Sequence, residues 1–149
     1  MAGAWPAMKI EWVIPCRYVE VRDNIATILG AGGDRFVVTE EPWEIAIMLA
    51  IRISALVEEL GPDRVYPVEN HIRDPRGAVI QEEVGSFSAT ARGEIATNNW
   101  LQGVWVPVEA KFPTETEGTY TITHKFGDSE HLLPVHIAHR RARGDTPAH

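Results

Sequence analysis

The stretch VWVPVEAKFPTETEGTYTITHKFGDSEHLLPVHIA, residues 104–138, alternates apolar and polar side chains in three successive runs. Strict alternation of this kind indicates half-buried β-strands. In the first run, residues 104–112, the even positions form the apolar face. The second run, residues 119–126, places four side chains on one face: Tyr120, Ile122, His124 and Phe126. The turn residues 127–129 then lead into the third run, residues 132–138.

The same period of two extends toward the N-terminus. Further runs that we expect to be strands cover residues 8–14, 18–22, 25–29, 35–39, 65–73 and 78–84, with a weak one at 86–91. The first of these runs ends at Pro15 and shares one face among Met8, Ile10, Trp12 and Ile14. Turn residues separate several runs, as at Asp23-Asn24 and at Asp74-Pro75-Arg76-Gly77.

Residues 45–60 fit both an alternating pattern and a helical stripe. Their β-branched residues favour a strand. We therefore expect a strand at 45–54, followed by a short helical turn through Leu60. Short strands with turn residues about every 8–12 positions predict an all-β fold. The expected architecture is an antiparallel β-sandwich, immunoglobulin-like or jelly-roll-like.

The chain has 149 residues, of which 44% are hydrophobic and 23% charged. These values suit one domain that folds without a metal or a disulfide. We expect a loose leader at residues 1–7, the sandwich at 8–138 and a flexible basic tail at 139–149. Cys16 is the one cysteine, which fits a reducing cytoplasm. No stretch is long and apolar enough to span a bilayer, and no cofactor is expected.

The net charge of −7 is unevenly distributed. Residues 139–149 hold three Arg and one Asp, a balance of +2, which leaves −9 for the rest of the chain. An acidic body repels nucleic acid and anionic membranes. The folded domain is therefore not expected to bind either of them. The expected partner is a second copy of the chain, in a homo-oligomer, or another protein.

Several segments share their sequence with a known pattern. They are ATILGAG at 26–32, LAIRI at 49–53, Glu59 with Gly61, DPRG at 74–77 and GTYTI at 118–122, followed by a Gly-Asp turn and a final strand. Together these segments resemble a bacterial family of small proteins of unknown function, the DUF6941 type, over residues 8–137. The resemblance implies a β-sandwich and an intracellular bacterial setting. It implies no activity.

Two histidines near the last turn are the candidate metal ligands. If Gly127 pairs with Glu130, then His124 and His131 are diagonal neighbours, about 7–8 Å apart. A metal site would need a third ligand, and the sequence places no cysteine or carboxylate there. We interpret the pair as two histidines at the rim of a sheet. No other spacing of residues indicates catalysis, so a chain without enzymatic activity is favoured.

The tryptophans are the candidate contact residues. Trp105 and Pro107 alternate with the apolar face of their strand, so they project from its opposite face. Pro107 also indicates an edge strand or a bulge. An outward Trp105 is either covered by another part of the chain, such as Trp5-Pro6, or serves as a contact anchor. Trp43 and Trp100 are interpreted as similar anchors at the rim.

Three functions remain open. The first is a non-catalytic interaction or structural module that self-associates or serves a larger bacterial or phage-encoded assembly. Its candidate interface consists of Trp105, Pro107, Trp43 and Trp100. The second is a sandwich that binds a small molecule, such as a carbohydrate, by stacking it on the same three tryptophans. The third is a metal-dependent enzyme built around the two histidines.

Overall fold

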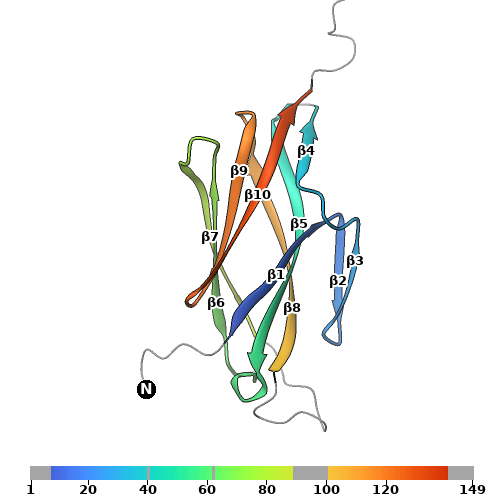
Figure 1. Cartoon of the computed structure of the whole chain (residues 1–149), viewed down its shortest axis with the longest axis vertical. Coiled ribbons are helices and arrows are strands. Elements are labelled where there is room, and N and C mark those ends of the chain that lie inside the picture. Colours follow the sequence, from blue (N-terminus) through green and yellow to red (C-terminus); the bar gives the residue numbers. More distant parts are fainter. Residues whose placement is uncertain (1–7, 40, 62, 89–100, 141–149) are drawn as a thin grey trace, which may run out of the picture.

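Two β-sheets lie face to face in the computed structural model of the chain, which describes residues 8–39, 41–61, 63–88 and 101–140 (Figure 1). The smaller sheet has the order β1-β5-β8, with bounds Lys9–Cys16, Glu44–Leu56 and Leu101–Pro113. The larger sheet has the order β4-β10-β9-β6-β7, with bounds Arg35–Val38, Ser129–His139, Gly118–Phe126, Tyr66–Arg73 and Val79–Phe87. A separate hairpin of β2 (Tyr18–Arg22) and β3 (Ile25–Leu29) packs on the outside of the smaller sheet. The predicted all-β fold is confirmed.

The core lies between the two sheets. Its largest contributions from the central strands are Ile47, Leu49, Ile51 and Ile53 of β5, and Tyr120, Ile122 and Phe126 of β9. Of the three β5 residues that alternate with these, Met48 and Ala50 are also apolar and pack under the β2–β3 hairpin. A strand covered on both faces reads as a continuous apolar run, which is why residues 45–60 fit two patterns. The predicted strand and short helical turn are confirmed, because β5 leads into a 3₁₀ turn at Val57–Glu59.

β1 departs from the predicted alternation at one residue. Glu11 has no partner in the register with β5, and this bulge lies between Ile10 and Trp12. Ile10 and Val13 contact the core, whereas Ile14 packs on the opposite side of the sheet. The prediction that Trp12 and Ile14 share a face with Ile10 was wrong. The extra residue of a bulge reverses the phase of every side chain after it.

The last hairpin turns one residue earlier than predicted. Phe126 pairs with Ser129, so the two turn residues are Gly127 and Asp128. Gly127 has a φ of 56°, and the first central residue of a favoured two-residue turn needs a positive φ. As a result, His124 lies directly opposite His131. The predicted diagonal placement of the two histidines was wrong.

Several strand boundaries and one pairing also differ from expectation. Pro15 lies within β1, which tolerates it as an edge strand. β10 pairs with β4 in parallel, so the sandwich is not wholly antiparallel. That pairing carries β10 to His139, one residue past the predicted end, and the Arg140 N–H donates to the Val38 carbonyl at 2.9 Å. The predicted leader, Trp100, residues 141–149 and most of the weak strand at 86–91 lie outside the described residues.

Candidate functional site

Three side chains form a row across the outer face of the smaller sheet. Trp12 of β1 pairs with Arg52 of β5, and Arg52 pairs with Trp105 of β8. The guanidinium carbon of Arg52 lies 5.2 Å from the ring centroid of Trp12 and 5.6 Å from that of Trp105. The two indole centroids are 6.1 Å apart. Both distances to the cation fall within cation–π range, so Arg52 holds the two indoles together. We call these three residues the aromatic row.

Two neighbours position the guanidinium of Arg52. A carboxylate oxygen of Glu11, the bulge residue, accepts a hydrogen bond from Arg52 Nε at 3.1 Å. On the other side, Gly103 leaves the space that the guanidinium fills, because a Cβ at Gly103 would overlap with it. The bulge and the glycine therefore both serve the aromatic row. One brings Trp12 to the outer face, and the other makes room for the cation.

Trp105 is held from behind by the β2–β3 hairpin. Its indole packs against a buried apolar cluster that includes Val19 of the hairpin, and Val21 and Ile28 of the hairpin pack against the same cluster. At the hairpin turn, Oδ1 of Asn24 accepts from the backbone N–H of Trp105 at 3.2 Å, and Nδ2 of Asn24 donates to the Gly103 carbonyl. Trp105 is therefore half-buried. The cover that we considered for it exists, but the hairpin supplies it; the predicted Trp5-Pro6 cover falls outside the described residues.

Trp12 is the open end of the aromatic row. Its side chain is 52% exposed, although an indole is among the largest apolar groups in proteins. Two other exposed apolar residues are close in sequence to Gly103 and Asn24, which contact members of the aromatic row. Leu101, which is 67% exposed, precedes Gly103 by two positions on β8, and Ile25 follows Asn24. The row thus stands in a surface region with exposed apolar side chains.

Pro107 and Trp43, the other predicted contact residues that the structure describes, do not join the aromatic row. Pro107 is exposed on β8, which is an edge strand as predicted. Trp43 precedes β5 at the end far from Arg52, and its ring stacks on that of His139 with a centroid distance of 4.2 Å and an angle of 12°. The Trp43 carbonyl also accepts from the backbone N–H of Thr114 at 2.7 Å. Trp43 therefore has an internal partner, and it lies apart from Trp105.

The candidate metal ligands occupy a different environment from the predicted rim. His124 is 0% exposed, so the interpretation of both histidines as rim residues was wrong. His131 is half-buried opposite it. Within the described residues, no group of three or more His, Cys, Asp and Glu side chains is arranged to hold a metal ion. The pair therefore has no third ligand of these types in that part of the chain.

Cys16 lies in the apolar cluster beneath the hairpin. Burial raises the pKa of its thiol above the ordinary value, and its Sγ lies 3.6 Å from the Met48 carbonyl. A thiol with a raised pKa stays protonated at neutral pH, and a protonated thiol is a poor nucleophile. The geometry thus supports a packing role for Cys16.

Sequence reasoning found Trp105 but missed Trp12 and Arg52. Arg52 had a usable signal, because it is a lone charge inside an otherwise apolar strand. Trp12 had none, since a one-residue bulge leaves no mark in the hydrophobic pattern. The chain matches no protein-family model and no curated protein. In the described part of the chain, no helix is long and apolar enough to cross a membrane.

Proposed function

We propose that this chain is a non-catalytic interaction module that contacts a second copy of itself, or another protein, through the aromatic row. The observation that carries the proposal is the exposed indole of Trp12, held beside Arg52 and Trp105 on rigid strands. Tryptophan and arginine are the residue types most enriched among side chains that dominate binding energy. We further propose that the module is an accessory subunit of a bacterial or phage-encoded assembly in a reducing cytoplasm.

The aromatic row is preorganised for contact. Arg52 is fixed by Glu11 and by both indoles, and Trp105 is fixed by the hairpin beneath it. Ordering flexible side chains at an interface costs binding energy, so groups that are already ordered bind more tightly. The row needs no rearrangement to present the indole of Trp12 to a partner.

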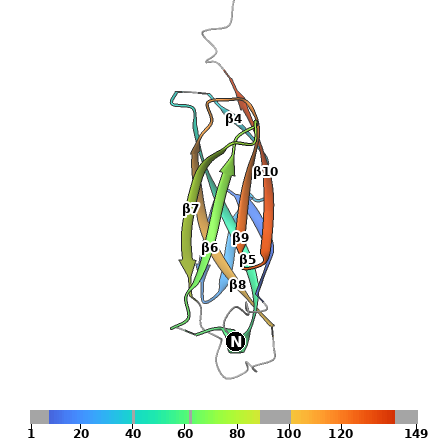
Figure 2. The same cartoon turned by 90° about the vertical axis from the view of Figure 1, so that its left-hand side faces the viewer.

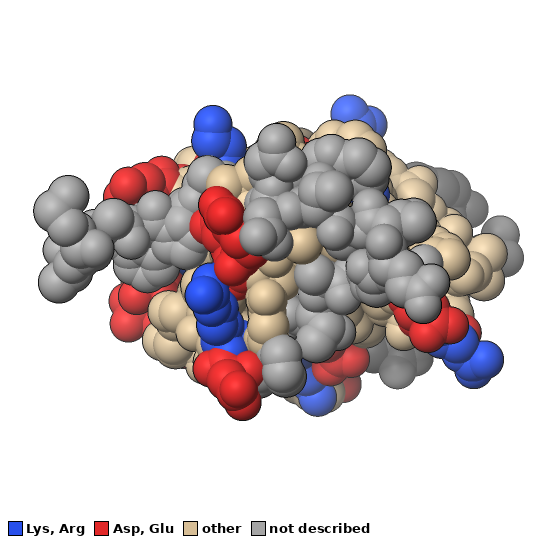
Figure 3. Space-filling view, turned by 90° about the horizontal axis from the view of Figure 1, so that it is seen from below, with Lys and Arg blue, Asp and Glu red and all other residues tan. Residues whose placement is uncertain are grey.

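The pairing of Arg52 with Glu11 favours an apolar centre of contact with a polar rim. In the end-on view of Figure 3, acidic and basic side chains of the described residues are interspersed, and neither sign forms a continuous patch there. Arg52 is already paired with Glu11, so its charge is largely compensated. We therefore expect apolar and aromatic groups of the partner to meet Trp12. Its charged groups belong at the periphery.

The test replaces one exposed apolar residue on each sheet. Trp12→Ala removes the open end of the aromatic row, and Leu132→Ala removes a comparably exposed side chain, 57% against 52%, from the larger sheet. Sedimentation velocity measures self-association of the wild type and both variants. Site-specific photo-cross-linking from position 12 or position 132, in the cells that produce the protein, detects another partner. We expect association or cross-links that depend on position 12 only.

The proposal fails if the wild type is a monomer and positions 12 and 132 give the same cross-links. Circular dichroism must show that Trp12→Ala keeps the β-sheet signal. A loss of association then reports the contact rather than unfolding.

A carbohydrate-binding sandwich is the second candidate, because sugar rings stack on exposed indoles. The geometry supports it less well. The rings of Trp12 and Trp105 meet at 47°, so they do not form one flat platform. Trp43, which was expected to contribute, lies elsewhere and stacks on His139. Titration of tryptophan fluorescence with soluble glycans separates the two functions, since an unchanged spectrum across the series eliminates the second.

A further inference from the structure

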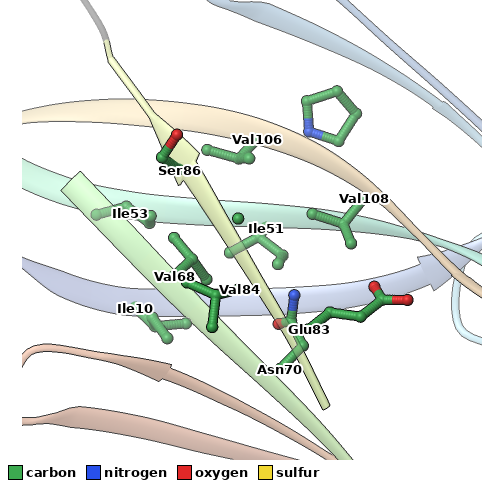
Figure 4. A pocket seen from close by; sticks show the side chains of 12 residues that line it. Ile10, Ile51, Ile53, Val68, Asn70, Glu83, Val84, Ser86, Val106 and Val108 are labelled. Carbon is green, nitrogen blue, oxygen red and sulfur yellow. The ribbon is translucent and has the colours of Figure 1, made fainter. Parts of the chain in front are cut away.

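β7 and β8 are edge strands of the two sheets (Figure 2). A cleft of about 250 Å³, lined by residues of both strands, opens between the sheets. Aliphatic side chains from both sheets line most of it, among them Ile51, Val68 and Val106 (Figure 4). At one end it reaches two polar residues, Asn70 and Glu83. A concave apolar space with a few convergent polar groups is the usual form of a small-molecule site.

Gly85 explains why the cleft is open. On β7 it pairs with the core residue Val68, between Phe87 and Glu83, so it occupies an inward position. A Cβ at Gly85 would meet nothing within 4 Å. The position that a core side chain would normally fill is therefore empty of protein. A glycine inside a strand often marks a place where a ligand or another backbone approaches closely.

The polar end of the cleft belongs to a row that crosses four strands. Glu83 of β7 pairs with Asn70 of β6, Asn70 pairs with His124 of β9, and His124 pairs with His131 of β10. We call these four residues the polar row. A recess of about 10 Å³ shares Asn70, Glu83 and Val108 with the cleft, and His124 is one of its other lining residues. The cleft thus continues into a recess about the size of one water-sized group.

His124, which lines this recess, has a buried ring nitrogen that can accept a hydrogen bond. Its Nδ1 lies 2.6 Å from Oδ1 of Asn70, and because an amide oxygen only accepts, Nδ1 is the donor. Burial lowers the pKa of His124 to about 4, so the ring is neutral at pH 7 and Nε2 carries a lone pair. Nε2 is buried and has no hydrogen-bond partner among the residues that the structure describes. A buried acceptor without a partner is costly, so a ligand group that donates a hydrogen bond to it gains binding free energy.

We infer that the cleft binds a small aliphatic molecule with one hydroxyl group, which donates its hydrogen bond to Nε2 of His124. The aliphatic part fits the lining of the cleft, and the recess has space for a hydroxyl but not for a larger polar group. A neutral donor suits the site, since a charged group would lose its hydration there. This site is separate from the aromatic row, because the cleft lies between the two sheets and the row lies on the outer face of the smaller sheet.

The test compares cyclohexanol with cyclohexanone. The two molecules have the same ring, but only the alcohol can donate a hydrogen bond. Nuclear magnetic resonance of ¹⁵N-histidine-labelled protein follows Nε2 of His124 during millimolar titrations. We expect saturable binding of cyclohexanol with a shift of that resonance, and binding of cyclohexanone at least about tenfold weaker.

Gly85→Leu tests the location, because its side chain fills the cleft from the empty position. We expect it to abolish the shift caused by cyclohexanol. Gly33→Leu is the matched control, since Gly33 also faces open space but lies in a loop away from the cleft. If circular dichroism shows that Gly85→Leu does not fold, Gly85→Val supplies the same block with a smaller side chain.

Four results would overturn the inference. They are no binding of either molecule, equal binding of both, binding without a shift of His124, and binding that survives the block at Gly85. The cleft could instead receive a strand from a second copy. In that case the alcohol would not bind, and sedimentation would show a dimer that the Gly85 variant loses.

Discussion

The aromatic row and the polar row are built in the same way, from side chains at paired positions on neighbouring strands, yet they differ in their contact with water. In the aromatic row, Arg52 has a carboxylate and two indoles as partners while Trp12 stands half in solvent. In the polar row, His124 is fully buried and its Nε2 has no hydrogen-bond partner in the described part of the chain. Water competes for the exposed contacts and weakens them. A buried polar group stabilises the fold strongly when it has a hydrogen-bond partner and destabilises it strongly when it has none. Substitutions in the polar row should therefore change stability most, and those in the aromatic row should change association.

The largest effect that separates the rows is the dependence of stability on pH. Burial, with a smaller contribution from the charge of His131, lowers the pKa of His124 from 6.5 to about 4. Between these values the unfolded chain binds a proton that the folded chain does not, so stability falls as the pH falls from 6.5 toward 4. The contribution is fully present above pH 6.5. We expect His124 to account for a loss of about 3 kcal/mol in the free energy of unfolding.

Urea unfolding at pH 7.5 and at pH 4 measures this loss, and His124→Gln isolates it. The difference in unfolding free energy between the two pH values should shrink by about 3 kcal/mol in this variant. His136→Gln is the control, because it removes an exposed imidazole from the neighbouring strand. Equal pH dependence in the wild type and His124→Gln would show that the polar row does not differ from the surface.

The next effect comes from breaking the polar row at Asn70. Asn70→Ala leaves Nδ1–H of His124 buried without an acceptor, which should lower the free energy of unfolding by about 2 kcal/mol. Gln81→Ala on the adjacent strand removes a similar amide whose hydrogen bond to the Lys111 carbonyl is solvent-accessible. Water replaces that bond, so we expect a loss below about 1 kcal/mol. Chemical denaturation at pH 7.5 compares the two variants, and similar losses would contradict the contrast.

The sandwich itself was predictable because its signal is local. Alternation along residues 104–138 predicts three strands, and the pattern of 45–60 predicts β5 and its 3₁₀ turn. The bulge at Glu11 and the one-residue shift at Gly127 were not predictable in this way. Both change the register by a single residue, and a single residue moves every later side chain to another face or another partner.

The two rows were predictable only in part, for the same reason. Trp105 could be placed on the outer face by counting along one strand. The aromatic row also needs Trp12 and Arg52, which meet it through the pairing of three strands. The polar row needs four strands in register, and Asn70 is 54 residues from His124 in the sequence. Tertiary pairing over such separations leaves no mark in a hydrophobic pattern.

A smaller effect tests the strength of the aromatic row. Trp12→Ala should lower the free energy of unfolding by about 1 kcal/mol, because the indole is half exposed and its contact with Arg52 is a surface cation–π interaction. A double-mutant cycle with Arg52→Ala should give a coupling energy of about 0.5–1 kcal/mol. Urea unfolding of the four proteins measures it. A coupling energy near zero would mean that Arg52 does not hold Trp12 in place.

The smallest effect sharpens the contrast with two glycines, one beside each row. A Cβ at Gly85 meets open space, so Gly85→Ala should raise the free energy of unfolding by about 0.5 kcal/mol through the lower entropy of the unfolded chain. A Cβ at Gly103 overlaps with the guanidinium of Arg52, so Gly103→Ala should displace the cation. We expect this displacement to lower the free energy of unfolding by about 0.5 kcal/mol. Each change adds one methyl group to an edge strand, so differences in chemistry cancel between the two variants. Paired urea titrations measure the two changes in the free energy of unfolding. If the changes have opposite signs, Gly85 leaves space that is empty of protein, whereas Gly103 makes room for the side chain of Arg52, which is already in place. A rise at both positions would mean that the entropy of the unfolded chain dominates at both, and a fall at both would mean that Gly85 does not face free space.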